Sequence, residues 1–518
     1  METTNSSTSP IEIPDADECA AVFTVEEVQA RISQEVNGLT TWVMSCHSLT
    51  FFEFEPQLVS KVLAWGCLLV QLFLCMRHEQ FEATNPQPPP GYKRRGPFSR
   101  WQGTCFGKVR YGRTYFYRAG RGYYPLDIEL GLTRDGFSMR LRSYASRLAT
   151  KVSYAQATLI LSWFLCWTPA QESLEEMVLG LGQHTAAWFE NAPVPEGDGE
   201  VLVVQVDSKA TPTATEAELE KRRGPRALNP HPGSQRHRGR AARQRRGSKK
   251  RRQKGDKAKN GKMATIVTMY TLRRSADGQL EGPLNKKVYA SYAPKRHAVA
   301  IARREANRRG FAPGSGKLIQ VVTDGDNDLE RYINEYFPEA EHTIDVYHVT
   351  EYLWEAGGCL YKEGSAELTE WVEAQKEALY QGQAAKIVTE IDRRLVQLPR
   401  SKRAARARLQ KIHEYLNKRV DKMDYQRLRE QDLEISSGAV EGAVNYVIAR
   451  RFDCGGMRWI KERAEHLLQL RCIEVNGDWD AFIHFVHDRT QVQAQQQRTN
   501  LSLKCTQPAP LPTYGLVH

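Results

Sequence analysis

VLVVQVD, residues 201–207, is a nearly continuous apolar run that ends in an acid. A run of this length and composition is typical of a strand that is buried on both faces of a sheet. A second run, LIQVVTDG at residues 318–325, has the same form and again carries an acid where the apolar residues end. Carboxylates at strand ends lie at the rim of a sheet, where ligands bind in α/β folds. The two runs therefore predict an α/β fold with a site at that rim.

The segments around these runs predict a mixed sheet with a definite order of elements. Three more strands are expected, at residues 264–272, 287–293 and 342–349. Two helices are expected between them, at residues 294–310 and 328–337. The order is then three strands, a helix, a strand, a helix and a strand, followed by a late helix. This is the order of a ribonuclease-H-like fold, in which the first and fourth strands each carry an aspartate.

The whole chain divides into segments of different composition. In order, we expect a helical N-terminal region (1–85), a linker and basic β-hairpin region (86–130), a helical region with a candidate helix-turn-helix for DNA binding (131–195), the first part of the core with a basic loop at 221–262 (196–350), a helical insertion (351–435), a late helix that completes the core (436–488) and a disordered tail (489–518). The hairpin is expected because β-prone and basic residues alternate around Gly112.

Composition and charge narrow the class of protein. The chain has 518 residues, of which 41% are hydrophobic and 9% aromatic, which excludes a wholly disordered protein. The formal charge is +12, but residues 221–262 hold 18 lysines and arginines and one acid, a net +17, so the rest of the chain has −5. A basic segment in a mildly acidic chain indicates a polyanion partner. The ten cysteines form no C-x-x-C pair, so neither a disulfide framework nor a cysteine zinc site is expected.

The longest apolar stretch, Val62–Met76, predicts a buried helix. It is too short to span a bilayer and contains Gln71. The first residues are polar and acidic, without the basic start of a signal peptide. We therefore expect a soluble cytoplasmic protein with no membrane contact.

Three acids form the candidate catalytic and metal site. Asp207 and Asp324 end the two buried runs, and Glu441 lies near the start of the late helix, for which Ser437 is the expected N-cap. Carboxylate oxygens are the ligands that Mg²⁺ prefers. Two Mg²⁺ ions, about 3.5–4 Å apart, would activate a water or a 3′-hydroxyl and stabilise the leaving oxygen of a phosphodiester, with Mn²⁺ as a substitute. No histidine or cysteine cluster at zinc spacing competes with this interpretation.

Several stretches resemble one family. They are VDSKATP (206–212), KRRGP (221–225), GDKAKNGK (255–262), VTDG (322–325), IDVYHV (344–349) with EYLW (351–354), and SSGAVE (436–441) with GMRW (456–459). Together, over roughly residues 95–485, they resemble bacterial insertion-sequence DDE transposases of the ISKra type, which are related to Mutator-like transposases.

The resemblance implies a catalytic triad of Asp207, Asp324 and Glu441, and it matches Asp345 and His348 to an Asp-x-x-His pair. It also implies DNA as partner, both the terminal inverted repeats of a mobile element and target DNA, in a bacterial, nucleoid-associated protein. Joining two ends requires a homodimer or a larger oligomer. Relatives often carry cysteine pairs in the N-terminal β region, whereas here Cys105 stands alone, so metal binding is not expected there.

Basic and aromatic residues near the site are expected to contact DNA. They are Lys209, Arg222, Arg223, Lys249, Lys250, Arg251, Arg252, Arg450, Arg451, Arg458 and Trp459. Trp459 either stacks on a splayed base or belongs to the core. The basic loop either contacts phosphates or is only a solvated segment.

Several of these residues have alternative roles. Asp345 competes with Asp324 for the second catalytic position, while Asp326 and Asp328 are expected to cap a helix. His348 either orients a carboxylate, contacts the scissile phosphate or only bonds locally. The alternatives to a transposase are a ribonuclease-H-like nuclease without transfer activity and a catalytically idle DNA-binding regulator derived from a transposase.

Overall fold

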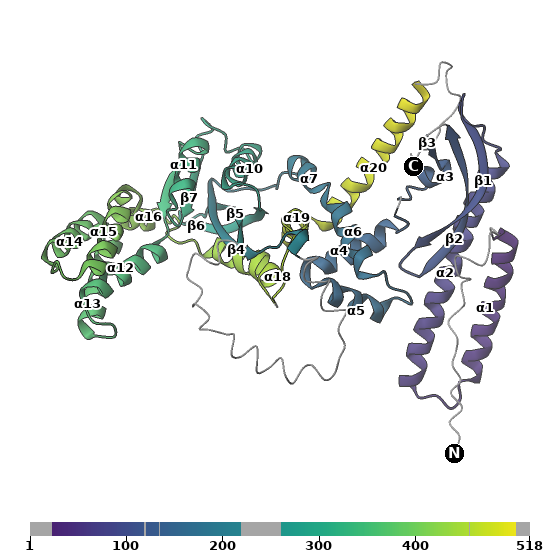
Figure 1. Cartoon of the computed structure of the whole chain (residues 1–518), viewed down its shortest axis with the longest axis horizontal. Helices are drawn as coiled ribbons and strands as arrows, with labels where there is room; N and C mark the ends of the chain where they lie inside the picture. Colours follow the sequence, from purple (N-terminus) through teal and green to yellow (C-terminus); the bar gives the residue numbers. More distant parts are fainter. Residues whose placement is uncertain (1–22, 119–120, 134, 219–260, 455, 504–518) are drawn as a thin grey trace. The chain divides into compact units, whose positions relative to one another are not determined.

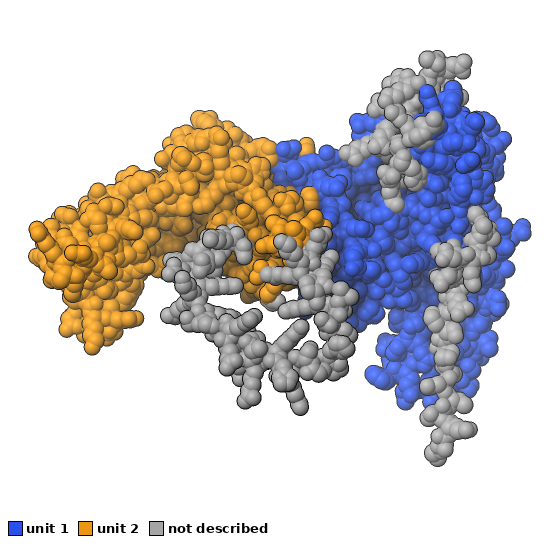
Figure 2. Space-filling model, in the orientation of Figure 1, with its two compact units in different colours: residues 1–190, 477–518 blue, residues 191–476 orange. Residues whose placement is uncertain are grey.

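The computed structural model describes residues 23–118, 121–133, 135–218, 261–454 and 456–503. The chain forms two compact units. The first unit contains residues 1–190 and 477–518, and the second contains residues 191–476. Figure 2 shows them in blue and orange.

The second unit is built on a five-stranded mixed sheet with the order β6-β5-β4-β7-β8 (Figure 1). Its strands are β4 (Val201–Pro212), β5 (Gly261–Arg274), β6 (Leu280–Ser291), β7 (Leu318–Thr323) and β8 (Glu341–Ile344). β4, β7 and β8 are parallel, whereas β5 runs antiparallel to both of its neighbours. Every residue from Val201 to Val206 is buried, so both faces of the central strand are covered. The predicted α/β class with a mixed sheet is confirmed.

Helices connect and extend this sheet. α10 (Lys295–Arg308) joins β6 to β7, and α11 (Asn327–Tyr336) joins β7 to β8. The predicted helical insertion follows β8. It consists of α12 (Val346–Leu360), α13 (Ala366–Tyr380), α14 (Ala384–Gln397), α15 (Arg403–Asn417), a 3₁₀ turn (Val420–Lys422) and α16 (Tyr425–Glu430).

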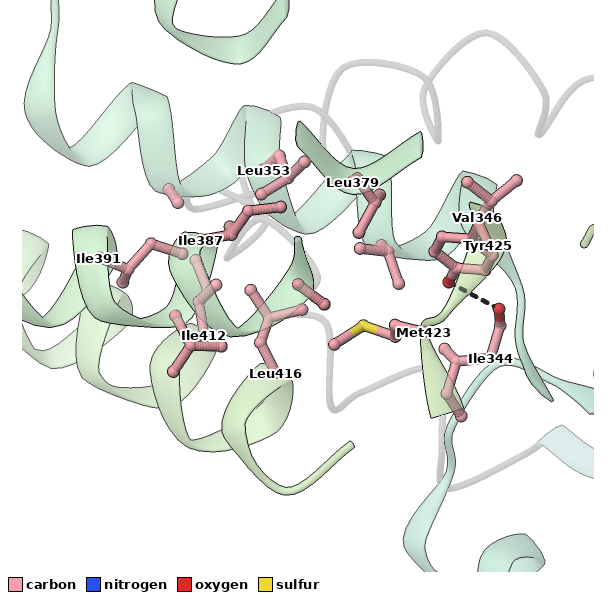
Figure 3. Packing of buried hydrophobic residues seen from close by; sticks show 14 of the residues in the cluster. Ile344, Val346, Leu353, Leu379, Ile387, Ile391, Ile412, Leu416, Met423 and Tyr425 are labelled. Carbon is pink, nitrogen blue, oxygen red and sulfur yellow. Dashed lines mark hydrogen bonds between the residues drawn. The ribbon is translucent and has the colours of Figure 1, made fainter. Parts of the chain in front are cut away.

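The insertion and the sheet share one hydrophobic core. Val201 and Val203 of β4 belong to the same buried cluster as the apolar side chains of α12 to α16. Figure 3 shows part of this cluster, including the Tyr425 hydroxyl that donates to the Ile344 carbonyl over 2.8 Å. This bond fixes the insertion to the end of β8.

The late helix is interrupted. α17 (Gly438–Ala443) is followed by a π-helical turn (Val444–Ala449), the short α18 (Arg450–Phe452) and α19 (Lys461–Val475). α17 packs against β4 and β5, and α19 packs against β6. The sequence therefore returns to the sheet after the insertion.

The first unit combines a helical hairpin with a small antiparallel sheet. α1 (Val25–Ser45) and α2 (Phe51–Ala83) form the hairpin, and β1 (Lys93–Gly103), β2 (Lys108–Arg118) and β3 (Arg121–Tyr123) form the sheet. Further helices follow, namely α3 (Pro125–Glu129), α4 (Met139–Lys151), α5 (Tyr154–Phe164), α6 (Gln171–Gly182), α7 (Thr185–Asn191) and the C-terminal α20 (Trp479–Leu503). α20 packs on α4, where the Trp479 indole donates to Ser143 Oγ over 2.9 Å.

α2 is longer than its apolar stretch predicted, because the helix extends that stretch at both ends. With 33 residues, it is the one helix in the described part of the chain that is long and apolar enough to cross a membrane, by length and composition alone. A third of its most apolar window is buried in the protein.

The hairpin predicted within residues 86–130 is present as β1 and β2, but it does not turn at Gly112. Gly112 lies inside β2, opposite Ser99 of β1. The chain turns instead at residues 104–107, where the Thr104 hydroxyl accepts the N–H of Gly107 over 3.2 Å. The polar hydroxyl, and not the glycine inside the aromatic stretch, ends the strand.

Two other boundaries differ from the sequence prediction. The strand predicted at 342–349 ends at Ile344, because Asp345 accepts the N–H of Tyr347 over 3.0 Å and caps α12. The tail predicted to be disordered from residue 489 is helical as far as Leu503. Residues 504–518, and the basic loop up to residue 260, lie outside the described residues.

Candidate functional site

Three aspartates lie side by side where the parallel pairing of three strands ends. In the register of the sheet, Val206 of β4 is opposite Thr323 of β7, which is opposite Ile344 of β8. Each of these three residues is followed by an aspartate, Asp207, Asp324 or Asp345. The sheet therefore brings the two predicted strand-end acids together, and adds the acid that was predicted as a rival for the second position.

Asp207 is influenced by the other acids of the site. Burial raises the pKa of its carboxyl group, and the negative charges of Asp324 and Glu441 raise it further. The N–H of Ser208, which donates to Asp207 Oδ1 over 2.6 Å, and the nearby His348 act in the opposite direction and lower this pKa. All five predicted site residues are thus at one end of the sheet, since Asp345 adjoins Asp324.

The neighbouring acids after β7 have structural roles. Asp326 accepts the N–H groups of Asp328 and Leu329, at 3.1 and 3.0 Å, and caps α11 as predicted. It also pairs with Lys295 at 3.0 Å. Asp328, which was expected to share the capping role, is instead exposed and pairs with Arg331.

Asp324 has a different environment. Its Oδ1 accepts the N–H of Asp326 over 3.0 Å, and its backbone carbonyl accepts the hydroxyl of Tyr415 over 2.6 Å. Tyr415 belongs to α15, so the insertion fixes the backbone at the end of β7. No signal in the sequence pointed to this tyrosine.

Asp345, His348 and Glu441 form a closer group within the site. One ligand atom from each lies within 4.8 Å of the others, a geometry that could hold a metal ion. Asp345 is fully buried, whereas Glu441 is exposed. Ser437 Oγ lies 2.6 Å from Asp345 Oδ2 and 3.2 Å from Glu441 Oε1. Ser437 occupies the N-cap position of α17 as predicted, but its side chain bonds these acids and not the helix N–H groups.

Two buried glutamines hold the segment that carries Glu441. Gln205 of β4 donates to the Ser436 carbonyl over 3.0 Å and accepts the N–H of Val440 over 2.9 Å. Gln320 of β7 donates to the Glu434 carbonyl over 2.7 Å and accepts its N–H over 2.9 Å. Both side chains are at most 1% exposed. The sequence contained a signal for them, because each is the single polar residue within a buried apolar run.

The described residues supply no cation that neutralises this site, because no lysine or arginine among them forms an ion pair with any of the four acids. Lys209, two residues after Asp207, pairs instead with Asp453 at 3.5 Å. Among the described residues, the group with metal-binding geometry is Asp345, His348 and Glu441, and it does not include Asp207 or Asp324. The charges of Asp324 and Glu441 nevertheless raise the pKa of Asp207, and a bound divalent cation would relieve this repulsion.

The predicted DNA contacts have different outcomes. Arg450 is exposed and Arg458 is partly exposed, which leaves both available. Arg451 is 1% exposed and lies over the Trp459 ring at 4.7 Å, and Trp459 packs against Phe452. Burial contradicts the predicted DNA contacts of Arg451 and Trp459, which belong to the core.

The predicted DNA contacts of the basic loop stay predictions. Arg222, Arg223, Lys249, Lys250, Arg251 and Arg252 lie outside the described residues. On the two sides of the loop, the described strands β4 and β5 are paired as far as Pro212 and Gly261. β4 is the strand that carries Asp207.

Comparison with known proteins does not assign the chain to a family. No family model matches it, and no curated protein matches it. What the site can do follows from its own geometry and chemistry.

Proposed function

We propose that this chain is a DDE transposase with a ribonuclease-H-like catalytic core. It binds the terminal inverted repeats of its element and catalyses metal-dependent cleavage and transfer of DNA strands. The observation that carries this proposal is the row of Asp207, Asp324 and Asp345 where the parallel pairing of three strands ends, with Glu441 of a late helix near Asp345. Four acids on rigid elements, none of them paired with a described lysine or arginine, suit metal-assisted phosphoryl transfer.

The strand order supports a ribonuclease-H-like core. Three antiparallel strands, β4 to β6, are followed along the chain by two strands that add in parallel to β4. A helix separates each of the last two strands from the preceding one, and a late helix returns to the sheet. This is the order that the sequence predicted, and it places the first and fourth strands next to each other.

The acids have distinct roles in the proposed site. Asp207, Asp324 and Glu441 would hold two Mg²⁺ ions, which supply an activated water or 3′-hydroxyl and stabilise the leaving oxygen. Asp345 is buried, caps α12 and bonds Ser437, which suits a residue that positions Glu441. His348 lies within reach of both acids and either orients a carboxylate or contacts the scissile phosphate.

The basic loop and the exposed arginines would contact phosphates. A loop with 18 lysines and arginines gives strong, salt-dependent affinity and little sequence choice. Sequence choice would come from the first unit, in which α6 and α7 are separated by two residues. α6 also packs on α4 and α5, which provides a rigid support for such a motif.

The test is a strand-cleavage and joining assay on a labelled duplex that carries the end of the element. Wild-type protein with Mg²⁺ is expected to nick and join the ends, and EDTA or Glu441→Gln is expected to abolish both products. Nicking without joining would favour the nuclease alternative. Specific binding to the end without cleavage in Mg²⁺ or Mn²⁺ would favour the regulator.

A further inference from the structure

Helix α2 has three sides with different environments. One side packs on β2, where the N–H of Arg110 donates to Gln71 Oε1 over 2.7 Å. A second side packs on α1, where Phe54 stacks on Trp42 with ring centroids 5.2 Å apart. The third side is exposed and apolar, although α2 belongs to a folded unit.

The exposed side forms a regular seam. Its members are Phe52, Val59, Val62, Leu69, Phe73 and Met76, and their exposed fractions range from 39% to 86%. These positions recur with the heptad spacing by which two helices pack along each other. Glu55 and Gly66 have the two remaining positions of this repeat, and the ring of Phe106 lies over Gly66. Phe106 is itself 41% exposed, so it continues the seam where α2 has no side chain.

α1 contributes little burial to this hairpin. Of its 21 residues, only Val28 is buried. Val36 and Val43 lie on one side of the helix, seven residues apart, and are exposed. Most of the stability of a helix comes from the packing of its apolar face, so a hairpin of this kind requires a partner.

We propose that the α1–α2 hairpin is a dimer interface on which the hairpin of a second copy of this chain packs. The charges at the two ends of the seam fit this occupant. Glu55 and Arg77 each lie 11 residues from Gly66, on opposite sides of it. An antiparallel, two-fold arrangement centred on Gly66 brings Glu55 of each copy to Arg77 of the other, which also pairs with Glu129 of its own chain.

The size of the hairpin also suits a dimer. The seam from Phe52 to Met76 is about 36 Å long at about 1.5 Å per residue, and two adjacent helices are about 20 Å wide. The hairpin therefore offers roughly 700 Å², close to the roughly 800 Å² per partner of a standard interface. Two hairpins together form a four-helix arrangement, the simplest way for such elements to bury apolar faces.

A bilayer is a poor alternative occupant. Gln71 lies in the middle of the apolar stretch and bonds the backbone of Arg110. Lys108 and Arg113 lie on the same strand. Insertion of α2 would carry these charges towards the hydrocarbon, at a cost of several kcal/mol. The interface does not depend on the proposed catalytic function, because it stands on the seam alone.

Sedimentation equilibrium of the full chain without DNA, from about 0.1 to 50 μM, tests this interface. The wild type is expected to be a dimer, and Leu69→Glu/Phe73→Glu to raise the dissociation constant at least about 100-fold. The matched control is Leu159→Glu/Phe164→Glu, which makes the same changes at exposed residues of α5 in the same unit. It is expected to remain a dimer.

A smaller substitution tests the orientation of the hairpins. Glu55→Arg is expected to weaken the dimer about tenfold. A monomeric wild type, or a Leu69→Glu/Phe73→Glu protein that dimerises like the control, would overturn the proposal. A wild type that is monomeric in solution but floats with neutral phosphatidylcholine vesicles would overturn it in favour of a bilayer. Circular dichroism of each variant verifies that the helical content is retained.

Discussion

Each unit of the protein contains an aspartate among buried strands and helices, but the charged groups around the two aspartates differ. Asp127 in the first unit is fully buried and has three partners, Arg100 at 3.0 Å, Arg113 at 2.5 Å and the Tyr111 hydroxyl at 2.5 Å. Asp207 in the second unit has acids as neighbours. The protein neutralises the first charge with two arginines, whereas none of the described lysines and arginines pairs with the second.

We interpret this difference as the one between a structural acid and a proposed metal ligand. Burial of a carboxylate is costly unless a charge or hydrogen bonds compensate it. Asp127 meets that condition within the fold. At Asp207 the fold instead places Asp324 and Glu441 nearby and raises the pKa of the carboxyl group. Such an arrangement of acids is stable when a bound ligand, and not a residue of the chain, supplies the positive charge.

The largest expected effect is on activity at the uncompensated site. Asp207→Asn is expected to reduce strand cleavage at least about 10³-fold, equivalent to about 4 kcal/mol, while DNA binding is retained. The same substitution removes like-charge repulsion, so it is expected to raise the thermal midpoint in metal-free buffer. Cleavage assays, filter binding and thermal unfolding check these outcomes. Full cleavage by the pure variant would contradict the site assignment.

The opposite result is expected at the compensated acid. Asp127→Asn leaves Arg100 and Arg113 without their common partner, and it is expected to lower the free energy of unfolding by about 3–5 kcal/mol. The control is Glu129→Gln, which removes a more exposed ion pair with Arg77 and is expected to cost less than about 1 kcal/mol. Urea unfolding measures both. Equal effects of the two substitutions would show that Asp127 is not a structural charge.

His342 of β8 offers a third case, a buried group that the fold keeps neutral. Burial, with the charge of Lys422 nearby, lowers its pKa to about 4 from an ordinary value of 6.5. Protonation therefore favours the unfolded state, so stability is present above pH 6.5 and is lost as the pH falls towards 4. The loss is at most about 3 kcal/mol. The pH dependence of urea unfolding is expected to be shallower in His342→Gln, and an unchanged slope would refute this origin.

The smallest expected effect concerns the glutamines that hold the late helix. Gln320→Leu leaves the buried N–H and carbonyl groups of Glu434 without their partner, at a cost of about 1–3 kcal/mol in unfolding free energy. Because Gln320 acts on Glu441 only through the backbone, kcat is expected to fall while the dissociation constant for DNA is unchanged. Gln381→Leu, at an exposed position, is the control. A loss of DNA affinity equal to the loss of kcat would contradict a positioning role.

The sequence predicted the parts of this site that follow from strand composition. Buried strands with terminal acids are visible as apolar runs, so Asp207 and Asp324 could be identified and aligned. Asp345 was read as part of a strand, because the capping bond that starts α12 depends on local backbone geometry. Gln205 and Gln320 stood out as polar residues in apolar runs, but their partners are more than 100 residues away in the sequence.

The remaining differences come from tertiary packing. Arg451 and Trp459 have the composition of a DNA contact, yet the core surrounds them. Residues 489–503 are polar and glutamine-rich, and composition alone predicted disorder, whereas they continue a helix that begins at Trp479 on a buried contact. The apolar stretch of α2 predicted a buried helix, because the sequence shows an apolar segment but does not show what covers it.

The most direct test of the central claim is Mn²⁺ binding, measured by electron paramagnetic resonance on the wild type, Asp207→Asn and Asp127→Asn. About two ions per chain are expected for the wild type, from the number that a cluster of this kind would hold in phosphoryl transfer. Asp207→Asn is expected to lose them, and the fraction of Asp127→Asn that remains folded is expected to keep them. A wild type that binds no Mn²⁺, or an Asp207→Asn protein that binds as many ions as the wild type, would contradict the claim that the strand-end acids form a metal site.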